Sequence, residues 1–193
     1  MSSRRVGAAL VSIFVSAFVA SPAHAAVYHS RDEALELAFP EADRTEARNF
    51  FLTEPQKKEI EKLARSTLDS DLLTVYVGYR GESLLGYAVF DTHVVRTLPE
   101  TFLLVLSPEG TLRAIHLVAF YEPEEYAPSN RWLGQFLGKK PGDRLALGRD
   151  VAAIAGSTLT SRAVTEAVRR ALAIYRVLLR REPSPPSEPS SEG

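Results

Sequence analysis

The chain has 193 residues, with 23 Lys and Arg against 24 Asp and Glu, and it contains no cysteine. This near-neutral charge argues against a nucleic-acid-binding protein, which needs surplus cations to displace the counterions of phosphate. The lack of cysteine excludes disulfides, thiolate metal sites, cysteine-ligated iron–sulfur clusters and c-type haem attachment. The length suits a single domain with enough core to be stable alone.

Residues 1–25 have the pattern of a signal peptide. Arg4 and Arg5 precede an uncharged apolar run at residues 6–20, and Ala-His-Ala at 23–25 has the small-x-small form that signal peptidase accepts. The run is 15 residues long, whereas a membrane-spanning helix needs about 20. We therefore expect cleavage and a periplasmic or otherwise exported protein, with an uncleaved anchor as the alternative. Cleavage leaves 21 basic and 24 acidic residues.

Two helices are predicted before the first strand. Residues 28–39 carry apolar side chains at helical spacing, and Pro40 ends that pattern. Thr53 followed by Pro55 is typical of a capped helix start, and residues 56–68 then alternate charged with apolar residues.

The middle of the chain changes to the pattern of strands. Its segments are rich in β-branched and aromatic residues, and the turn signals between them predict two hairpins. The four expected strands are residues 72–79, 83–90, 101–106 and 111–121.

The C-terminal part is predicted to be mainly helical. Residues 130–137 favour a short helix, and residues 138–148 are irregular. Residues 162–181 are predicted as a long helix that gathers its apolar residues on one face, namely Val164, Val168, Ala171, Leu172, Tyr175 and Leu178. Residues 182–193 form a Pro/Ser-rich tail that we expect to be disordered.

These elements predict an α+β fold in one domain, residues 26–181. The expected architecture is an antiparallel sheet of about four strands, preceded by two N-terminal helices and covered by one long C-terminal helix.

Residues 155–161 read Ala-Gly-Ser-Thr-Leu-Thr-Ser and lie directly before the long helix. Hydroxyl residues commonly cap helix starts, and a glycine such as Gly156 permits the preceding turn. The same geometry also suits a phosphate, because a helix start presents unpaired N–H groups, and Arg162 adds a positive charge. The sequence has no Gly-rich loop typical of nucleoside triphosphate sites.

Residues 150–164, Asp-Val-Ala-Ala-Ile-Ala-Gly-Ser-Thr-Leu-Thr-Ser-Arg-Ala-Val, resemble the flavinylation motif of FMN-binding domains. These domains occur in the C subunit of the sodium-pumping NADH:quinone oxidoreductase, the G subunit of the Rnf complex and small exported flavoproteins. Their motif reads Asp-x-x-Ser/Thr-Gly-Ala-Thr, which Gly156 and Thr158 match. The similarity extends over residues 72–175, with Tyr126 and Trp132 among the matching residues.

In that family an exported flavin transferase joins FMN to the last threonine of the motif through a phosphodiester. The resemblance implies attachment at Thr158, with FMN contacts from Gly156, Ser157, Thr160, Ser161, Arg162, Tyr126 and Trp132. Ser157, Thr160 and Ser161 are the alternative acceptor hydroxyls. The other motif positions fall on Ala152, Ala155 and Ser157, which keeps non-covalent binding and loss of the cofactor open.

Other candidate sites carry weaker signals. An isoalloxazine ring stacks on aromatic side chains, and Tyr121, Tyr126, Trp132 and Phe136 precede the motif, although ordinary packing also explains them. The acidic residues Glu122, Glu124 and Glu125 are expected in a solvated loop, with a redox-partner surface or a cation site as alternatives. Of the four histidines, the three that follow the predicted signal peptide, His29, His93 and His116, lie far apart, so no metal site is expected.

The sequence therefore predicts an exported FMN-binding flavoprotein that carries electrons between periplasmic or membrane redox partners. FMN would do the redox chemistry and Thr158 would tether it, so an electron-transfer role is favoured over a stand-alone enzyme. The expected partners are a flavin transferase and redox proteins, and no nucleic acid. The alternative is a cofactor-free exported binding or scaffold module that keeps the fold.

Overall fold

The structure is a computed structural model that describes residues 26–95 and 97–180. The predicted signal peptide, residues 1–25, and the predicted tail, residues 182–193, lie outside the described residues.

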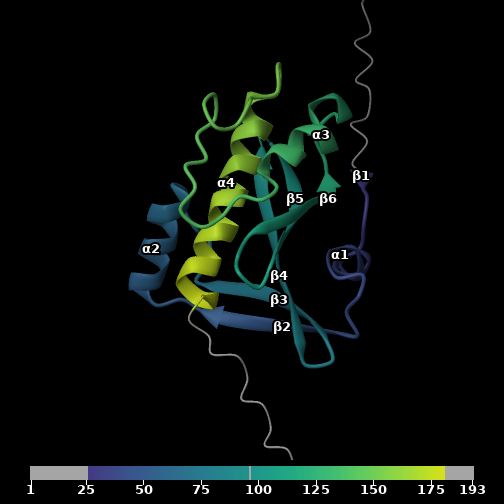
Figure 1. The fold of residues 1–193 in the computed structure, drawn as a ribbon. Coiled ribbons are helices and arrows are strands. Elements are labelled where there is room, and N and C mark those ends of the chain that lie inside the picture. The colour runs from purple at the N-terminus through teal and green to yellow at the C-terminus, as the bar shows by residue number, and fades with distance from the viewer. Residues whose placement is uncertain (1–25, 96, 181–193) are drawn as a thin grey trace, which may run out of the picture.

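A six-stranded antiparallel sheet forms the centre of the molecule, in the order β1-β6-β5-β4-β3-β2 (Figure 1). The strands β3 to β6 form a meander and confirm the four predicted strands. The strands span Ala26–Val27 (β1), Arg44–Phe51 (β2), Leu72–Arg80 (β3), Ser83–Val95 (β4), Leu98–Leu106 (β5) and Leu112–Phe120 (β6).

The N-terminal part differs from the prediction, because β2 lies between the two predicted helices. β2 pairs along the whole of β3, from Arg44 opposite Tyr79 to Phe51 opposite Leu72. It is an edge strand whose side chains are exposed or half-buried, so its sequence lacks the apolar run that marks the central strands. The helices themselves are confirmed as α1, Arg31–Ala38, and α2, Glu54–Ala64, each beginning at a capping box.

The sheet carries helices on both faces (Figure 1). α2 and the long helix α4, Thr158–Ile174, pack together on one face over a core that includes Val75, Phe102 and Leu104. α1 covers part of the other face, where Ala34 packs in a smaller apolar cluster with residues of β4, β5 and β6. The α+β fold class is therefore confirmed.

The long helix starts earlier than predicted. It begins at Thr158 instead of residue 162, and it continues through a π-helical segment, Tyr175–Leu179. The hydroxyl residues 158, 160 and 161 therefore belong to the first turn of α4 and do not precede it. Two short elements stand before it: the 3-10 segment Glu124–Tyr126 (η1), and the helix Asn130–Leu133 (α3) with its 3-10 extension Gly134–Phe136 (η2).

No helix in residues 26–95 or 97–180 is long and apolar enough to span a membrane.

Candidate functional site

The segment before α4 is held in place by α3 and η2. The indole Nε1 of Trp132 donates to the carbonyl oxygen of Ala152 at 2.7 Å, and the backbone N–H of Ala152 donates to Gln135 Oε1 at 2.8 Å. The Trp132 ring packs edge to face against Phe136, which is fully buried. These contacts fix the backbone of Ala152 on both sides, so the path of the chain into α4 is well defined.

Two hydroxyls at the start of α4 are engaged by the local backbone. Ser157 Oγ donates to the carbonyl oxygen of Tyr126 at 3.0 Å. Ser161 Oγ donates to the carbonyl oxygen of Ser157 and accepts from the N–H of Ile154, both at 2.9 Å. Gly156 lies in the turn from Ile154 to Ser157 and has a φ of +79°, a left-handed conformation that glycine adopts without strain. Ser157 and Ser161 thus fold the segment back on the first turn of α4.

Thr158 differs from the other hydroxyl residues of the segment because it is exposed, whereas Ser157, Thr160 and Ser161 are buried. It is the first residue of α4, and Arg162, also exposed, lies one turn further on. The first N–H groups of a helix have no partner within the helix and carry partial positive charge. The exposed hydroxyl of Thr158 therefore stands where an anionic group is favoured.

A small cavity of about 100 Å³ opens beside this helix start. It is lined by Val95, Glu122, Tyr126 and residues 157–160. Only 6% of Glu122 is exposed, and its Oε1 has no hydrogen-bond partner in the described part of the chain. An unpaired buried acceptor is costly, so this atom suits a ligand that supplies a donor.

The structure brings together four of the predicted site residues, Tyr126, Ser157, Thr158 and Thr160, around one cavity. Trp132 lies outside that lining and contacts the entering backbone instead.

Val95, Glu122 and Leu159 were missed as site residues. The prediction that Glu122 belongs to a solvated acidic loop is wrong, although Glu124 and Glu125 are exposed as expected. The sequence feature that could have indicated burial is the position of Glu122, two residues after the end of β6.

The motif positions that depart from the usual pattern are also visible. Ala152 and Ala155 are exposed. Asp150, two residues before Ala152, accepts a hydrogen bond from the N–H of Ala146 at 3.1 Å, so its carboxylate closes its own loop. No group of three or more His, Asp or Glu side chains suited to a metal ion occurs among the described residues.

A comparison with protein-family models includes the same segment. Residues 99–173 match the family model of the FMN-binding domain, a range that runs from β5 to nearly the end of α4. The chain is also similar to the G subunit of the Na(+)-translocating ferredoxin:NAD(+) oxidoreductase complex of Acetobacterium woodii, with 28% identity over 135 residues. That match covers 63% of this chain and 65% of the relative, so part of the relative has no counterpart in the match. Residues 99–173 of this chain therefore resemble the FMN-binding domain family.

Proposed function

We propose that this protein is an exported electron-transfer flavoprotein that carries FMN at the start of α4, with the FMN phosphate esterified to Thr158. The observation that carries the proposal is the exposed Thr158 hydroxyl on the first turn of a long helix, within a segment that matches the FMN-binding domain family.

The hydrogen bonds of the segment support Thr158 over the other hydroxyls as the attachment point. Ser157 and Ser161 are buried and donate to carbonyl oxygens, and Thr160 is buried. An ester at Ser157 or Ser161 would break a hydrogen bond of the folded segment, whereas an ester at Thr158 requires no such loss. The ester joins Thr158 Oγ1 to the FMN phosphorus, and the hydroxyl gives up its proton. A flavin transferase would supply the activated FMN donor and its leaving group.

The residues around the helix start suit the polar parts of FMN. The first N–H groups of α4 and the guanidinium of Arg162 favour a phosphate. The buried Oε1 of Glu122 is an acceptor without a partner among the described residues, and the hydroxyls of a ribityl chain are donors. The phosphate would thus meet hydrogen-bond donors, and the ribityl chain would meet an acceptor.

The flavin ring would lie outside the cavity. Sites that enclose a drug-sized ligand have volumes of about 300–1,000 Å³, whereas this cavity measures about 100 Å³. Leu159 and Tyr126 line the cavity, and Leu159, which is 44% exposed, offers an apolar contact. A ring held at the surface is accessible to a partner protein, which favours electron transfer over catalysis in an enclosed site. FMN supplies the redox chemistry when bound, and the protein tethers and orients it.

The relative suggests the type of partner. It is named as a component of a Na(+)-translocating ferredoxin:NAD(+) oxidoreductase complex, and we propose that this chain likewise exchanges electrons with membrane or periplasmic redox proteins. The pattern of residues 1–25 supports export.

The test is the intact mass of the mature protein after export in a host that has a flavin transferase. We expect one FMN per chain on the peptide that contains Thr158. Thr158→Ala should abolish the adduct, whereas Ser157→Ala, one residue away, should retain it.

An unmodified protein with extractable FMN would rule out the covalent link and leave the electron-carrier function standing. A colourless, unmodified protein from a host that flavinylates a known acceptor would favour the cofactor-free module instead.

A further inference from the structure

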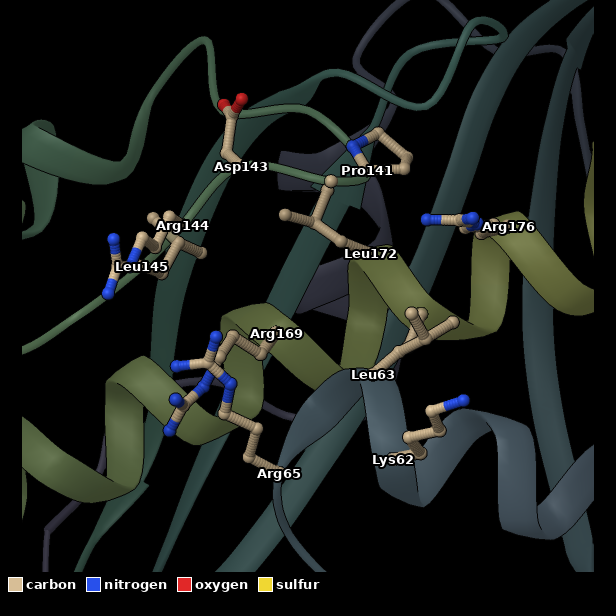
Figure 2. A pocket seen from close by; sticks show the side chains of 12 residues that line it. Lys62, Leu63, Arg65, Pro141, Asp143, Arg144, Leu145, Arg169, Leu172 and Arg176 are labelled. Carbon is tan, nitrogen blue, oxygen red and sulfur yellow. The ribbon is translucent and has the colours of Figure 1, made fainter.

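A cavity of about 280 Å³ lies between α2, α4 and the loop that follows η2 (Figure 2). Five cationic side chains and one carboxylate line it, so it carries an excess of four positive charges. The cations are Lys62, Arg65, Arg144, Arg169 and Arg176, and the carboxylate is Asp143.

These cations are not paired with carboxylates in the part of the chain that the structure describes, although Glu166 acts electrostatically on Arg169. None of the five takes part in an ion pair there. Asp143 Oδ2 accepts a hydrogen bond from the N–H of Lys140 at 2.9 Å, which holds this carboxylate on its own loop. The cavity is therefore a concentration of positive charge that no ion pair among the described residues neutralises.

Arg169 is the most telling member, because its Nε is buried and has no acceptor among the described residues. The guanidinium groups of Arg65 and Arg169 lie next to each other in Figure 2. Burial lowers the pKa of Arg169, and the positive charge of Arg65 lowers it further, against an opposing effect of Glu166. An anion shared by Arg65 and Arg169 would offset the repulsion between their charges and accept a hydrogen bond from the buried Nε of Arg169.

The backbone at Arg65 also favours a specific role. Arg65 ends α2 in the left-handed conformation, with φ of +56°. Among the described residues, it is the only one besides glycines that has a positive φ. Glycine is the usual residue at such a helix end, and strained positions occur preferentially at binding sites. The chain accepts this strain with an arginine whose side chain lines the cavity.

We propose that this cavity binds a phosphate-class oxyanion, with Arg65 and Arg169 as the main donors. The planar guanidinium forks match phosphate oxygens, and the remaining cations line the same cavity. Leu63, Leu145 and Leu172 line the same cavity, and their apolar surface strengthens charge–charge interactions by excluding water. A soluble diphosphate and the headgroup of an anionic phospholipid share this chemistry.

This site is separate from the proposed FMN site. Arg169 follows Thr158 by eleven residues on the same helix, which corresponds to about 16 Å along its axis. The two linings have no residue in common. The anion bound here is therefore distinct from the phosphate of FMN at Thr158.

The test uses the full mature chain and inorganic pyrophosphate, with binding measured by calorimetry and by the shift in Tm. We expect one pyrophosphate per chain, and Arg169→Gln or Arg65→Gln should weaken binding about ten- to hundredfold. Lys58→Gln is the matched control, because Lys58 is exposed on α2, pairs with Glu54 and does not line the cavity. It should bind as the wild type does.

A second variant keeps the test decisive if an arginine variant does not fold. Asp143→Asn removes the carboxylate from the lining and retains an oxygen for the Lys140 N–H, so it should tighten binding up to about fivefold. Thr158→Ala should not change pyrophosphate binding. Loss of binding in Thr158→Ala, no effect of Asp143→Asn, or an equal Tm shift with chloride at the same ionic strength would overturn the proposal.

Vesicles separate the two sources of the anion. Binding to phosphatidylglycerol vesicles but not to phosphatidylcholine vesicles, competed by pyrophosphate and lost in Arg169→Gln, identifies a lipid headgroup. Pyrophosphate binding without vesicle binding identifies a soluble phosphate. Binding of neither probe would contradict the proposal.

Discussion

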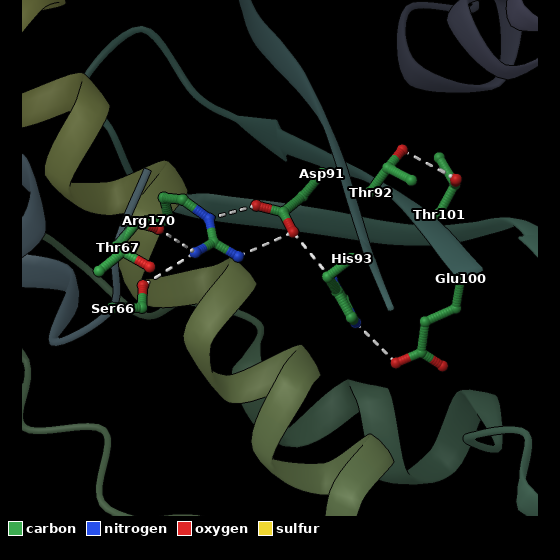
Figure 3. A network of polar contacts seen from close by, with 8 residues as sticks. All are labelled: Ser66, Thr67, Asp91, Thr92, His93, Glu100, Thr101 and Arg170. Carbon is green, nitrogen blue, oxygen red and sulfur yellow. Dashed lines mark hydrogen bonds and ion pairs between the residues drawn. The ribbon is translucent and has the colours of Figure 1, made fainter. Parts of the chain in front are cut away.

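Arg170 of α4 and Asp91 of β4 form a two-pronged ion pair, with Nε to Oδ2 at 2.6 Å and Nη2 to Oδ1 at 3.0 Å (Figure 3). Asp91 also contacts His93 Nδ1 at 3.0 Å, and His93 Nε2 lies 2.6 Å from Oε1 of Glu100, a residue that is fully buried. The guanidinium further donates to Ser66 Oγ at 2.8 Å. This chain of contacts ties α4 to the sheet and to the end of α2, and so holds the helix start where the candidate FMN site lies.

Replacing Arg170 is expected to destabilise the protein strongly. Arg170→Ala removes one of the two cationic partners of the buried Asp91 carboxylate and leaves only His93, which costs about 2–3 kcal/mol. Urea unfolding of the mature chain measures this loss. Arg113→Ala, on an exposed position of β6, should change the unfolding free energy by less than about 0.5 kcal/mol. A loss below about 1 kcal/mol for Arg170→Ala would show that the pair contributes little.

The stability of the protein should depend on pH through His93. Burial alone would lower the pKa of His93, but its hydrogen bonds to Asp91 and Glu100 outweigh this and raise the pKa to about 9. A raised pKa means that this stabilisation is fully present below about pH 6.5 and is lost as the pH rises through about 9. The shift corresponds to a contribution on the order of 3 kcal/mol.

Unfolding free energies between pH 6 and pH 10 test this, and His93→Gln should flatten the decline. An NMR titration that places the imidazole pKa near its ordinary value would contradict the assignment.

Thr158→Ala and Ser161→Ala should separate attachment from folding. Thr158 is exposed, so its replacement should leave stability within about 0.5 kcal/mol while removing the FMN adduct. Ser161 is fully buried, and its replacement leaves the N–H of Ile154 without its acceptor, at a cost of about 1–3 kcal/mol. Thermal unfolding and intact mass on the same samples give both results. Equal destabilisation by both variants would mean that Thr158 is structural.

Glu122→Leu is expected to stabilise the FMN-free protein and to reduce the attachment of FMN. An apolar side chain removes a buried carboxylate whose Oε1 lacks a partner in the described structure, so the FMN-free protein should gain about 1–3 kcal/mol. The same change removes the acceptor proposed for the ribityl hydroxyls and should reduce the yield of flavinylated protein. Denaturant unfolding and the ratio of flavin to protein absorbance measure the two effects. A loss of stability would show that Glu122 is needed by the fold itself.

The central strands were predictable from local sequence, and so was a long helix close to the hydroxyl-rich segment. β5 and β6 are apolar segments separated by Ser107 to Gly110, and the structure forms that turn, with the N–H of Ser107 donating to Thr111 at 2.8 Å and Gly110 at φ of +81°. The hydroxyl-rich segment before residue 162 was likewise visible, because glycine and capping hydroxyls act over a few residues. Its helix start was placed four residues late, since Ser161 bonds back to Ile154 and Ser157 and permits an earlier start.

Strand β2, the buried Glu122 and the cationic cavity depended on tertiary structure. Residues 44–51 become a strand because β3 offers an edge to pair with, and their own side chains are mostly polar. The cavity gathers residues as distant in sequence as Lys62 and Arg176, which only the packing of α2 on α4 brings together.

The amino-acid sequence by itself thus determined the hairpins and the hydroxyl-rich helix start, since those follow from short-range patterning and turn chemistry. Burial and the proximity of charges arise from contacts between distant segments. Only the tertiary structure therefore decided that Glu122 is buried with Oε1 unpaired among the described residues, and that the cations of α2, α4 and the loop after η2 line one cavity.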